Sequence, residues 1–379
     1  MRRVLVVGST GSIGTAALEV ARALPRLLRI TGLACRGSVD LLAAQAAEFR
    51  PDAVAIDGPC RLDDDRFSGA RVHRGGAGLL DMIRGTGADV VLNGISGAAG
   101  LLPSLAALES GKDLALANKE SIVMAGPLVL AEAARRGRLV LPVDSEHAAL
   151  FSILRSVRED EVAELVITAS GGAFRDLPVE ALASVRYADA LAHPTWRMGP
   201  KITVDSATLA NKGLEVIEAH RLFGVPLERV KVLVHRASRV HAMVRTVDGT
   251  LHLEASTPDM RIPIQNALTY PAVLPTRVPW LDLTAGKLEF QVVDSRRYPM
   301  LDLAFRAAAG GPALPVVYNA ANEAAVEAFR CDAIPFPRIP SLVEQLLSLD
   351  WPSRAETADE VLAVDREARA RAAERLGTS

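Results

Sequence analysis

The sequence predicts an α/β protein made of three parts: a parallel-sheet domain, a second α+β domain and a helical bundle. Over residues 1–143, short apolar runs alternate with helical segments, a pattern typical of βαβ units. Beyond Pro142 the strand-like runs include a hairpin signal, and the end of the chain is helical throughout. With 379 residues, the chain is also longer than a single ordinary core accommodates.

The first domain, residues 1–143, is expected to hold a parallel sheet with right-handed crossovers. Helical segments lie at Thr15–Leu24 and Leu41–Phe49. The expected buried strands are Val4–Val7, Ile30–Cys35, Ala53–Ile56, Val90–Leu92, Leu114–Ala117 and Leu139–Leu141.

The second domain, residues 144–271, combines strands with a long loop. Asp248-Gly249 is a hairpin signal between two of its strand-like runs. An irregular stretch, Ala190–Asn211, leads into a helix at Lys212–Phe223, and residues 190–200 are expected to form a lid. The expected strands are Leu165–Thr168, Val230–Val234, Ala242–Val247 and Leu251–Glu254.

The last part of the chain consists of a linker and a helical bundle. Residues 272–299 are rich in Pro and Trp and are expected to connect the second domain to a helical domain at 300–379. Ser341 with Glu344, and Thr357 with Glu360, match the capping-box pattern of a helix start.

Composition excludes several classes of protein. The net charge of −2 gives no basic field for nucleic acid or anionic lipid. No apolar stretch approaches the roughly 18 residues of a membrane span. The three cysteines, Cys35, Cys60 and Cys331, are widely spaced, which argues against a disulfide framework. We therefore expect a soluble, cytoplasmic protein.

A glycine-rich turn follows the first predicted strand. Residues 8–14 read GSTGSIG and run into a helix, so Gly8 and Gly11 permit a tight turn that lets a pyrophosphate approach the backbone. The spacing is GxxGxxG instead of GxGxxG, so a glycine turn without a ligand remains the alternative. Its place in the first βαβ unit favours a Rossmann-like dinucleotide site.

The end of the second predicted strand indicates which dinucleotide binds. An NAD site places Asp or Glu there, whereas this chain has Arg36, Gly37 and Ser38. Arg36 and Ser38 can bind the 2′-phosphate that an acid would repel, which predicts NADPH. An ordinary solvated arginine is the alternative.

A pair of acids follows the last predicted strand of the first domain. Asp144 and Glu146, two residues apart, would point to one side of an extended chain and share a cation. Oxygen ligands suit Mg²⁺ or Mn²⁺, and Glu215 is the candidate third ligand. A solvated polar strand end is the alternative.

Donor-rich residues in the second domain predict a site for a phosphate monoester. Hydroxyl, imidazole, amide and ammonium groups near a helix start suit such an anion. Trp196 and Met198 lie in the predicted lid, which would exclude water. Core roles for Trp196 and His193 remain open. The donors are Ser170, His193, Ser206, Asn211 and Lys212.

Lys119 follows the predicted strand Leu114–Ala117. Ligands bind at the carboxyl ends of parallel strands, and a lysine there can reach a substrate oxygen. A surface lysine is the alternative.

These residues lie in segments that resemble the 1-deoxy-D-xylulose 5-phosphate reductoisomerase family across nearly the whole chain. The segments are GSTGSIG at 8–14, LANKES at 116–121, LPVDSEH at 141–147, TASGGAF at 168–174, HPTWRMG at 193–199, DSATLANKGLEVIEAH at 205–220, TPDMRIPIQNALTYP at 257–271 and YNAANEAAVEAF at 318–329.

The resemblance implies a homodimeric reductoisomerase of non-mevalonate isoprenoid biosynthesis. It implies that a carbon–carbon bond migrates by a retro-aldol/aldol route and that NADPH reduces the resulting aldehyde. Metal ligation by Asp144, Glu146 and Glu215 follows from it, as do catalytic roles for these residues and Lys119. Substrate positions would be Lys119, Ser145, Glu146, Ser170, His193, Trp196, Met198, Ser206, Asn211, Lys212 and Glu215. Cofactor contacts would include Thr10, Gly11, Ser12, Ile13, Asn118, Glu120 and Gly199.

Several positions depart from the family pattern. Many members have Gly-x-Asn where this chain has Arg36-Gly37-Ser38, and Ser where it has Arg197. His235-Arg236-Ala237-Ser238-Arg239-Val240-His241 replaces His-Pro-Gln-Ser-Ile-x-His. These changes leave open a specialised paralogue acting on a related phosphate or phosphonate. A non-catalytic dinucleotide-sensing protein is a further alternative, against which the metal triad, Lys119 and Trp196 argue.

Overall fold

The chain divides into two compact units. The structure, a computed structural model, describes residues 1–59, 64–196 and 198–377. The first unit comprises residues 1–118, 129–148 and 259–279, and the second comprises 119–128, 149–258 and 280–379. The chain passes from one unit to the other within α5 (Lys119–Arg136) and within α6 (Ser145–Leu154). The sequence-based division at residues 143, 271 and 299 stays a prediction.

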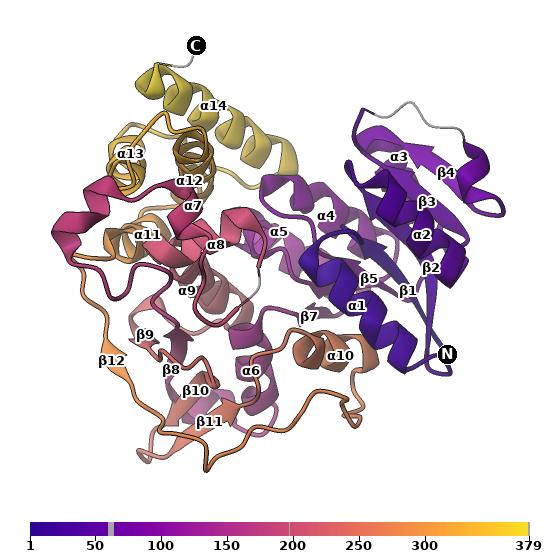
Figure 1. Cartoon of the computed structure of the whole chain (residues 1–379), viewed down its shortest axis with the longest axis horizontal. Helices are drawn as coiled ribbons and strands as arrows, with labels where there is room; N and C mark the ends of the chain where they lie inside the picture. The colour runs from indigo at the N-terminus through magenta and orange to yellow at the C-terminus, as the bar shows by residue number, and fades with distance from the viewer. Residues whose placement is uncertain (60–63, 197, 378–379) are drawn as a thin grey trace. The chain divides into compact units, whose positions relative to one another are not determined.

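The first unit is built on a seven-stranded parallel sheet in the order β4-β3-β2-β1-β5-β6-β7 (Figure 1). Its strands are β1 (Arg2–Val7), β2 (Leu28–Cys35), β3 (Ala53–Ile56), β4 (Arg71–Arg74), β5 (Val90–Asn93), β6 (Asp113–Leu116) and β7 (Val140–Pro142). Its helices are α1 (Ser12–Ala23), α2 (Val39–Phe49), α3 (Gly75–Gly85), α4 (Leu101–Glu109) and α10 (Arg261–Thr269), with the 3₁₀ turns η1 (Asp64–Phe67) and η2 (Ala98–Gly100).

This sheet confirms the predicted α/β, Rossmann-like class. Val4, Leu5, Val6 and Val7 are fully buried, as expected of a central parallel strand covered on both faces. The strand order reverses between β1 and β5, so right-handed crossovers place α1 and α2 on one face and α3 and α4 on the other. In agreement, α3 packs against α4 and α1 packs against α10. The carboxyl ends of β1 and β5 thereby flank the expected ligand position.

The second unit holds a five-stranded mixed sheet in the order β11-β10-β8-β9-β12. Its strands are β8 (Val162–Ala169), β9 (Val230–Val234), β10 (Val240–Thr246), β11 (Leu251–Ala255) and β12 (Gln291–Val292). Its helices are α7 (Tyr187–Ala190), α8 (Pro200–Thr208), α9 (Ala210–Phe223), α11 (Pro299–Ala309), α12 (Leu314–Arg330), α13 (Arg338–Leu347) and α14 (Ala358–Leu376), with the 3₁₀ turns η3 (Glu159–Glu161), η4 (Val179–Ser184) and η5 (Leu227–Arg229).

Successive side chains of β8 point to opposite faces of this sheet. Leu165 and Ile167 pack into a core with Leu150 of α6 and Val216 of α9, whereas Val166 faces a smaller cluster on the other side. This one-sided core holds β8 and α9 together, and both elements carry predicted site residues. The predicted hairpin is confirmed, because β10 and β11 pair antiparallel across Asp248-Gly249.

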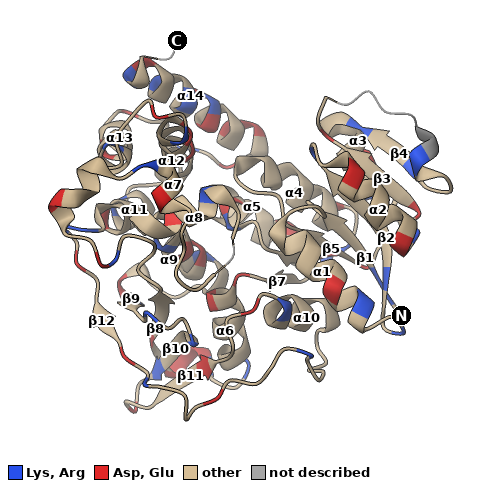
Figure 2. Cartoon of the chain, viewed as in Figure 1, with Lys and Arg blue, Asp and Glu red and all other residues tan. Residues whose placement is uncertain are grey.

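The C-terminal helices confirm the expected helical end of the chain. Thr357 and Glu360 form the predicted capping box at the start of α14. Figure 2 shows basic and acidic residues interleaved along α14, where Arg369 pairs with Asp365 and Arg371 pairs with Glu367. Such pairs, four residues apart, each stabilise a helix by about 0.3–0.5 kcal/mol. None of the helices in the described ranges combines the length and apolar character that a membrane crossing requires.

Four sequence-based predictions were wrong. Residues 200–208, predicted irregular, form α8, because Pro200 at the first helical position starts a helix. Asp144 and Glu146 are not in an extended segment, because α6 begins at Ser145. Ser341 lies inside α13, whose N-cap is Pro337, so the predicted capping box with Glu344 does not form. The strand β4 was missed because its sequence, RVHR, is polar and lies at a sheet edge.

Candidate functional site

The turn between β1 and α1 brings backbone atoms unusually close together. Gly8 has a φ of +79°, and a Cβ atom there would lie 2.9 Å from the carbonyl carbon of Gly94. A Cβ atom on Gly14 would lie 2.3 Å from the oxygen of Gly8. Gly11 is the N-cap of α1 and offers no side-chain acceptor to the N–H groups of the first helical turn. The turn is therefore a backbone cradle at a helix N-terminus, which suits an anion.

Other predicted cofactor residues lie at the same carboxyl edge of the sheet. Arg36, Gly37 and Ser38 are exposed and follow β2, the neighbour of β1. Asn118 follows β6, and its side-chain amide donates to the carbonyl oxygens of Ile95 and Gly97, at 2.8 and 2.9 Å. Thr10, Ser12 and Ile13 belong to the β1–α1 turn itself.

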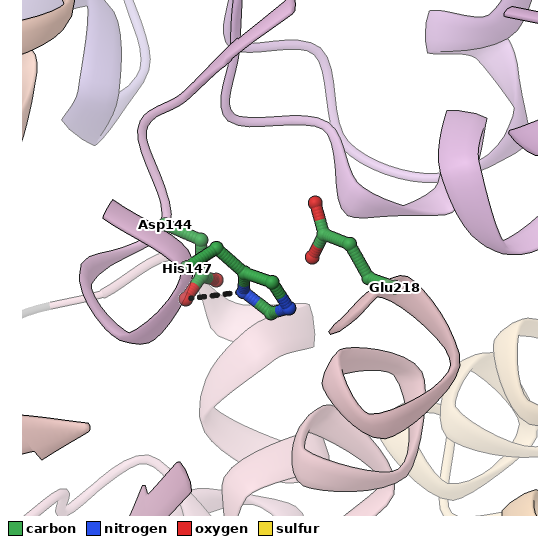
Figure 3. A group of neighbouring side chains, drawn as sticks. All are labelled: Asp144, His147 and Glu218. Carbon is green, nitrogen blue, oxygen red and sulfur yellow. Dashed lines mark ion pairs between the residues drawn. The ribbon is translucent and has the colours of Figure 1, made fainter. Parts of the chain in front are cut away.

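The acids Asp144 and Glu146 lie at the N-terminus of α6. The backbone N–H of Glu146 donates to Asp144 Oδ1 at 3.3 Å, and Ser145 Oγ donates to Glu146 Oε2 at 2.6 Å. The Nδ1 atom of the fully buried His147 lies 3.5 Å from Asp144 Oδ1; Figure 3 marks this pair and also draws Glu218, a buried residue of α9. Carboxylates are favourable at a helix N-terminus, where the backbone dipole is positive. The start of α6 thus presents two acids that lie two residues apart in the chain.

In the second unit, Glu215 is a buried carboxylate surrounded by donors. Its side chain, 1% exposed, accepts from Lys119 Nζ at 2.9 Å and also from Lys212 Nζ and Asn211 Nδ2. Lys119 Nζ donates in addition to Asn211 Oδ1 at 2.7 Å. Burying an ion without a partner is expensive, and the ion pairs of Glu215 with two ammonium groups offset part of that cost. The structure thereby brings together four of the predicted site residues.

A second cluster joins Ser170, His193 and Ser206. His193 Nε2 lies 3.0 Å from both hydroxyl oxygens, and the Gly172 N–H donates to Ser170 Oγ at 3.1 Å. The backbone N–H groups of Thr195 and Trp196 both donate to His193 Nδ1, at 3.2 and 2.9 Å. Because Nδ1 accepts, the neutral ring carries its proton on Nε2 and donates toward the hydroxyls.

His193 is kept neutral by its surroundings. Burial, together with the positive charge of Arg175, lowers the pKa of His193 from 6.5 to about 4. The two serine oxygens accept from His193 and Gly172, which leaves their own O–H groups to donate to a ligand. The cluster is therefore a set of neutral donors suited to an anion.

The remaining predicted positions of the lid lie between α7 and α8. Trp196 is half-buried, with its ring centroid 6.1 Å from that of His241, and Met198 is also half-buried. Arg197, which departs from the family pattern, falls outside the described residues, as does Cys60. Cys35 is buried and Cys331 is exposed.

Glu120 and the start of α8 belong to a buried ion network. Lys201 Nζ lies 3.1 Å from Glu120 Oε1 and 2.8 Å from Asp205 Oδ2, and Asn322 donates to Asp205 at 2.8 Å. Burial by itself would lower the pKa of Lys201, but the two carboxylates outweigh it and raise that pKa. Gly199, the N-cap of α8, accepts from Thr203. Glu120 is therefore partnered within the second unit, and its predicted contact with the cofactor stays a prediction.

Two residues near these clusters were missed from the sequence. Arg175 follows the glycine turn after β8 and contacts the backbone of Ser170, and Lys201 forms ion pairs with the buried acids Glu120 and Asp205. The signal for Arg175 was a basic residue immediately after a donor-rich turn. For Lys201 the spacing of four residues to Asp205 was the available signal, but it has meaning only once α8 is recognised as a helix.

Three family models match consecutive parts of the chain. The model of 1-deoxy-D-xylulose 5-phosphate reductoisomerase matches residues 4–126. The model of its C-terminal domain matches residues 140–223, and a further DXP reductoisomerase C-terminal domain model matches residues 255–371.

Similar proteins extend over the whole chain. A 1-deoxy-D-xylulose 5-phosphate reductoisomerase of Thermomicrobium roseum is 48% identical over 99% of this chain and 97% of its own length. The enzyme of the same name from Thermosynechococcus vestitus is 44% identical over 96% of this chain and 91% of its own length.

Solved structures agree in fold. A DOX-P reductoisomerase crystallised with NADPH, fosmidomycin and magnesium has a TM-score of 0.93 and 35% identity, covering 100% of this chain and 98% of its own. The Zymomonas mobilis 1-deoxy-D-xylulose 5-phosphate reductoisomerase, in complex with NADPH, has a TM-score of 0.92 and 38% identity, with both chains covered completely. The chain belongs to the 1-deoxy-D-xylulose 5-phosphate reductoisomerase family.

Proposed function

We propose that this chain converts 1-deoxy-D-xylulose 5-phosphate into 2-C-methyl-D-erythritol 4-phosphate, using NADPH and a divalent metal ion, in isoprenoid biosynthesis. Full-length similarity to enzymes of that name supports the reaction. The observation in this chain that carries the proposal is the buried group of Lys119, Asn211, Lys212 and Glu215. A dinucleotide-sensing protein would have no use for buried charges that are costly to maintain.

The first unit fits NADPH. At Gly8 and Gly14 there is no room for a Cβ atom, so a ligand can approach the main chain closely, as a pyrophosphate site requires. We infer that the turn from Gly8 to Ile13 holds the pyrophosphate and that Arg36 and Ser38, exposed at the end of β2, hold the 2′-phosphate. Gly37 allows the main chain to pass close to that group, and Asn118, Glu120 and Gly199 are proposed as further contacts.

The donor chemistry of three carboxylates fits a hard divalent ion. We infer that Asp144, Glu146 and Glu215 hold Mg²⁺ or Mn²⁺, because carboxylate oxygens are the ligands these ions prefer. Ser145 and His147 already orient the acids at the start of α6. Lys119 and Lys212 form ion pairs with the buried carboxylate of Glu215.

When bound, the metal ion supplies a Lewis acid for vicinal substrate oxygens, and NADPH supplies the hydride. The chain's own residues bind and orient the substrate. Ser170, His193, Ser206 and Asn211 present donors to the phosphate, and Lys212 adds a positive charge. Lys119 is placed to donate a proton to a substrate oxygen as negative charge develops there.

The lid segment completes the site. Trp196 and Met198 are proposed to cover the substrate and exclude water, which strengthens every charge interaction beneath them. The backbone N–H of Trp196 donates to His193, so the lid and the neutral donor cluster are linked through one imidazole ring.

We further infer that the enzyme is a homodimer in the cytoplasm. Apolar side chains are unusually exposed on the linker and on β12, where Trp280 is 90% exposed and Val292 is 86% exposed. Patches of this kind mark interaction sites, and β12 is an outer strand with an unpaired edge. The exposed thiol of Cys331 suits a reducing compartment. Sedimentation of the wild type against Trp280→Ser tests the dimer, which the substitution should weaken.

One assay tests the reaction. NADPH oxidation is followed with 1-deoxy-D-xylulose 5-phosphate, with Mg²⁺ or Mn²⁺ and with a chelator, and the product is identified by mass and NMR. We expect metal-dependent oxidation that yields 2-C-methyl-D-erythritol 4-phosphate. NADPH binding without oxidation would favour the sensing protein, and oxidation only with a related phosphate or phosphonate would favour the paralogue.

A further inference from the structure

The loop that follows β8, residues 170–177, has its carbonyl oxygens held by side chains. Gly171 and Gly172 have φ values of +84° and +70°, so the chain turns sharply after Ser170. Tyr298 donates its hydroxyl to the oxygen of Gly171 at 2.9 Å. Arg297 donates to the oxygens of Phe174 and Leu177, at 2.9 and 2.6 Å. The loop is thus fixed through its main chain.

Arg175 is the member of this group that contacts Ser170. Its Nη1 atom donates to the carbonyl oxygens of Ser170 and Arg236, both at 2.9 Å. These residues lie just beyond the carboxyl ends of β8 and β9, which pair in parallel. Hydrogen bonds from a guanidinium group are stronger than neutral ones, so Arg175 ties the two strand ends together.

The other side of Ser170 faces the donor cluster. Its hydroxyl oxygen lies 3.0 Å from His193 Nε2 and 3.5 Å from Ser206 Oγ. Ser170 is therefore held by its carbonyl on the Arg175 side and presents its hydroxyl on the His193 side. A shift of this carbonyl would move the hydroxyl out of the cluster.

Arg175 also brings positive charge to a cluster that otherwise consists of neutral donors. Its side chain is 19% exposed, and its electrostatic effect reaches His193. Asp176 is the acid beside it, but Asp176 is exposed and is also paired with Arg236. Two arginines share one acid there, so positive charge remains in excess behind Ser170.

We propose that Arg175 is a positioning residue of the phosphate subsite, which holds the Ser170 hydroxyl toward the phosphate and supplies positive charge behind the neutral donors. The proposal rests on the proposed function, because the subsite is defined by the sugar phosphate. It adds to that function a residue that makes no direct substrate contact. Wild-type turnover tests the function, and the Arg175 variants test only this proposal.

The test compares Arg175→Met and Arg175→Lys with Arg297→Met, a matched control that loses hydrogen bonds to the same loop but lies away from Ser170. In Arg175→Met, we expect KM for 1-deoxy-D-xylulose 5-phosphate, and the inhibition constant of inorganic phosphate, to rise about tenfold or more, which corresponds to about 1.4 kcal/mol. The kcat should stay within about threefold, because the reacting carbons are not touched. Arg175→Lys keeps the charge and should recover part of the loss. Arg297→Met should leave KM within about threefold of the wild type.

An NMR titration of the His193 ring distinguishes the electrostatic effect of Arg175 from a general loss of loop stability. Its resonance is assigned with His193→Asn. In Arg175→Met the pKa of His193 should rise from about 4 toward its ordinary value, whereas Arg297→Met should not change it. If Arg175→Met does not fold, the test compares the KM values of Arg175→Lys and Arg297→Lys. Unchanged KM in both Arg175 variants, or an equal rise in KM in the Arg297 control, would overturn the proposal.

Discussion

The proposed cofactor site of the first unit and the charged cluster of the second unit use different chemistry. At the β1–α1 turn, Gly8 and Gly14 let main-chain atoms approach to distances that any Cβ atom would block. In the second unit, Lys119, Lys212 and Glu215 are long side chains, each less than 5% exposed. We propose that the first region recognises its ligand with the backbone and that the second does so with buried charge.

The difference teaches which changes each region tolerates. A backbone site is insensitive to most side-chain replacements but is damaged by an added methyl group. A buried charge cluster is damaged by any change of charge, because the remaining ions lose their compensation. The two regions should therefore respond to substitution independently, and the following predictions test that independence.

The largest effect is expected from Glu215→Gln. The amide keeps the shape of the side chain but removes the negative charge that pairs with Lys119 and Lys212 and that we propose binds the metal ion, so kcat should fall by about 10³-fold or more. The dissociation constant of NADPH, measured by fluorescence, should stay within about threefold. The exposed Glu228→Gln is the control and should retain full turnover. A large loss of NADPH affinity in Glu215→Gln would contradict the independence of the two regions.

The converse change is Gly8→Ala. The added Cβ atom would clash with Gly94 in a backbone conformation with φ of +79°, so NADPH affinity should fall by about tenfold or more. Gly85→Ala adds a methyl group into open space and serves as the control. Calorimetric titration with NADPH measures both. Unaltered affinity in Gly8→Ala would show that the cradle does not bind the dinucleotide.

Arg36 is the positively charged side chain proposed to bind the 2′-phosphate of NADPH. Arg36→Ala should lower the preference for NADPH over NADH by about tenfold, the value of one charge-assisted hydrogen bond to the 2′-phosphate. Arg26→Ala, also on the surface, is the control. The measurement is kcat/KM with each nucleotide. The same preference in both variants would remove the role proposed for Arg36.

The charged unit should also show a pH response at His193. The folded-state pKa of His193, about 4, lies below its ordinary value of 6.5, so the unfolded chain binds the proton first as the pH falls. Stability from neutral His193 is complete above pH 6.5 and is lost between pH 6.5 and about 4. His193→Asn should flatten the dependence of the free energy of unfolding on pH in this range. The exposed His252→Asn should not, and equal slopes in all three proteins would contradict the account.

The smallest effect is expected where neither region is involved. Thr357→Ala removes the cap of α14 and should lower stability by about 1 kcal/mol, a shift in Tm of about 2–4 °C. Ser353→Ala is the control, because Ser353 is exposed and lies outside the helices. Differential scanning calorimetry distinguishes them. A change in kcat or NADPH affinity in Thr357→Ala would mean that the helical end of the chain is coupled to the ligand sites.

The first unit could be predicted well from the sequence because its signals are local. An apolar run such as Val4–Val7 and the glycines beside it determine a strand and a turn without reference to the rest of the chain. The strand β4 was not predicted because a polar edge strand has no apolar pattern in its sequence. Residues 259–279, including α10, join the first unit through packing against β1 and β7, which no local pattern reveals.

The site of the second unit was predictable in its residues but less so in its geometry. Residue type and spacing indicated Ser170, His193 and Glu215, but α8 was missed because KITVDSAT has weak helix propensity. For Asp144 and Glu146, which belong to the first unit, the predicted extended conformation was wrong because a helix starts between them. A basic residue after a donor-rich turn was the one signal for Arg175, but the positioning role proposed for it depends on two carbonyl oxygens 5 and 61 residues away in the chain.

The most direct test of the central claim is Mn²⁺ binding, measured by electron paramagnetic resonance on the wild type, Glu215→Gln and Gly8→Ala, alongside NADPH binding to the same samples. We expect Glu215→Gln to weaken Mn²⁺ binding by about tenfold or more while NADPH binding is retained. We expect Gly8→Ala to weaken NADPH binding by about tenfold or more while Mn²⁺ binding is retained. Equal Mn²⁺ affinity in the wild type and Glu215→Gln would contradict the account.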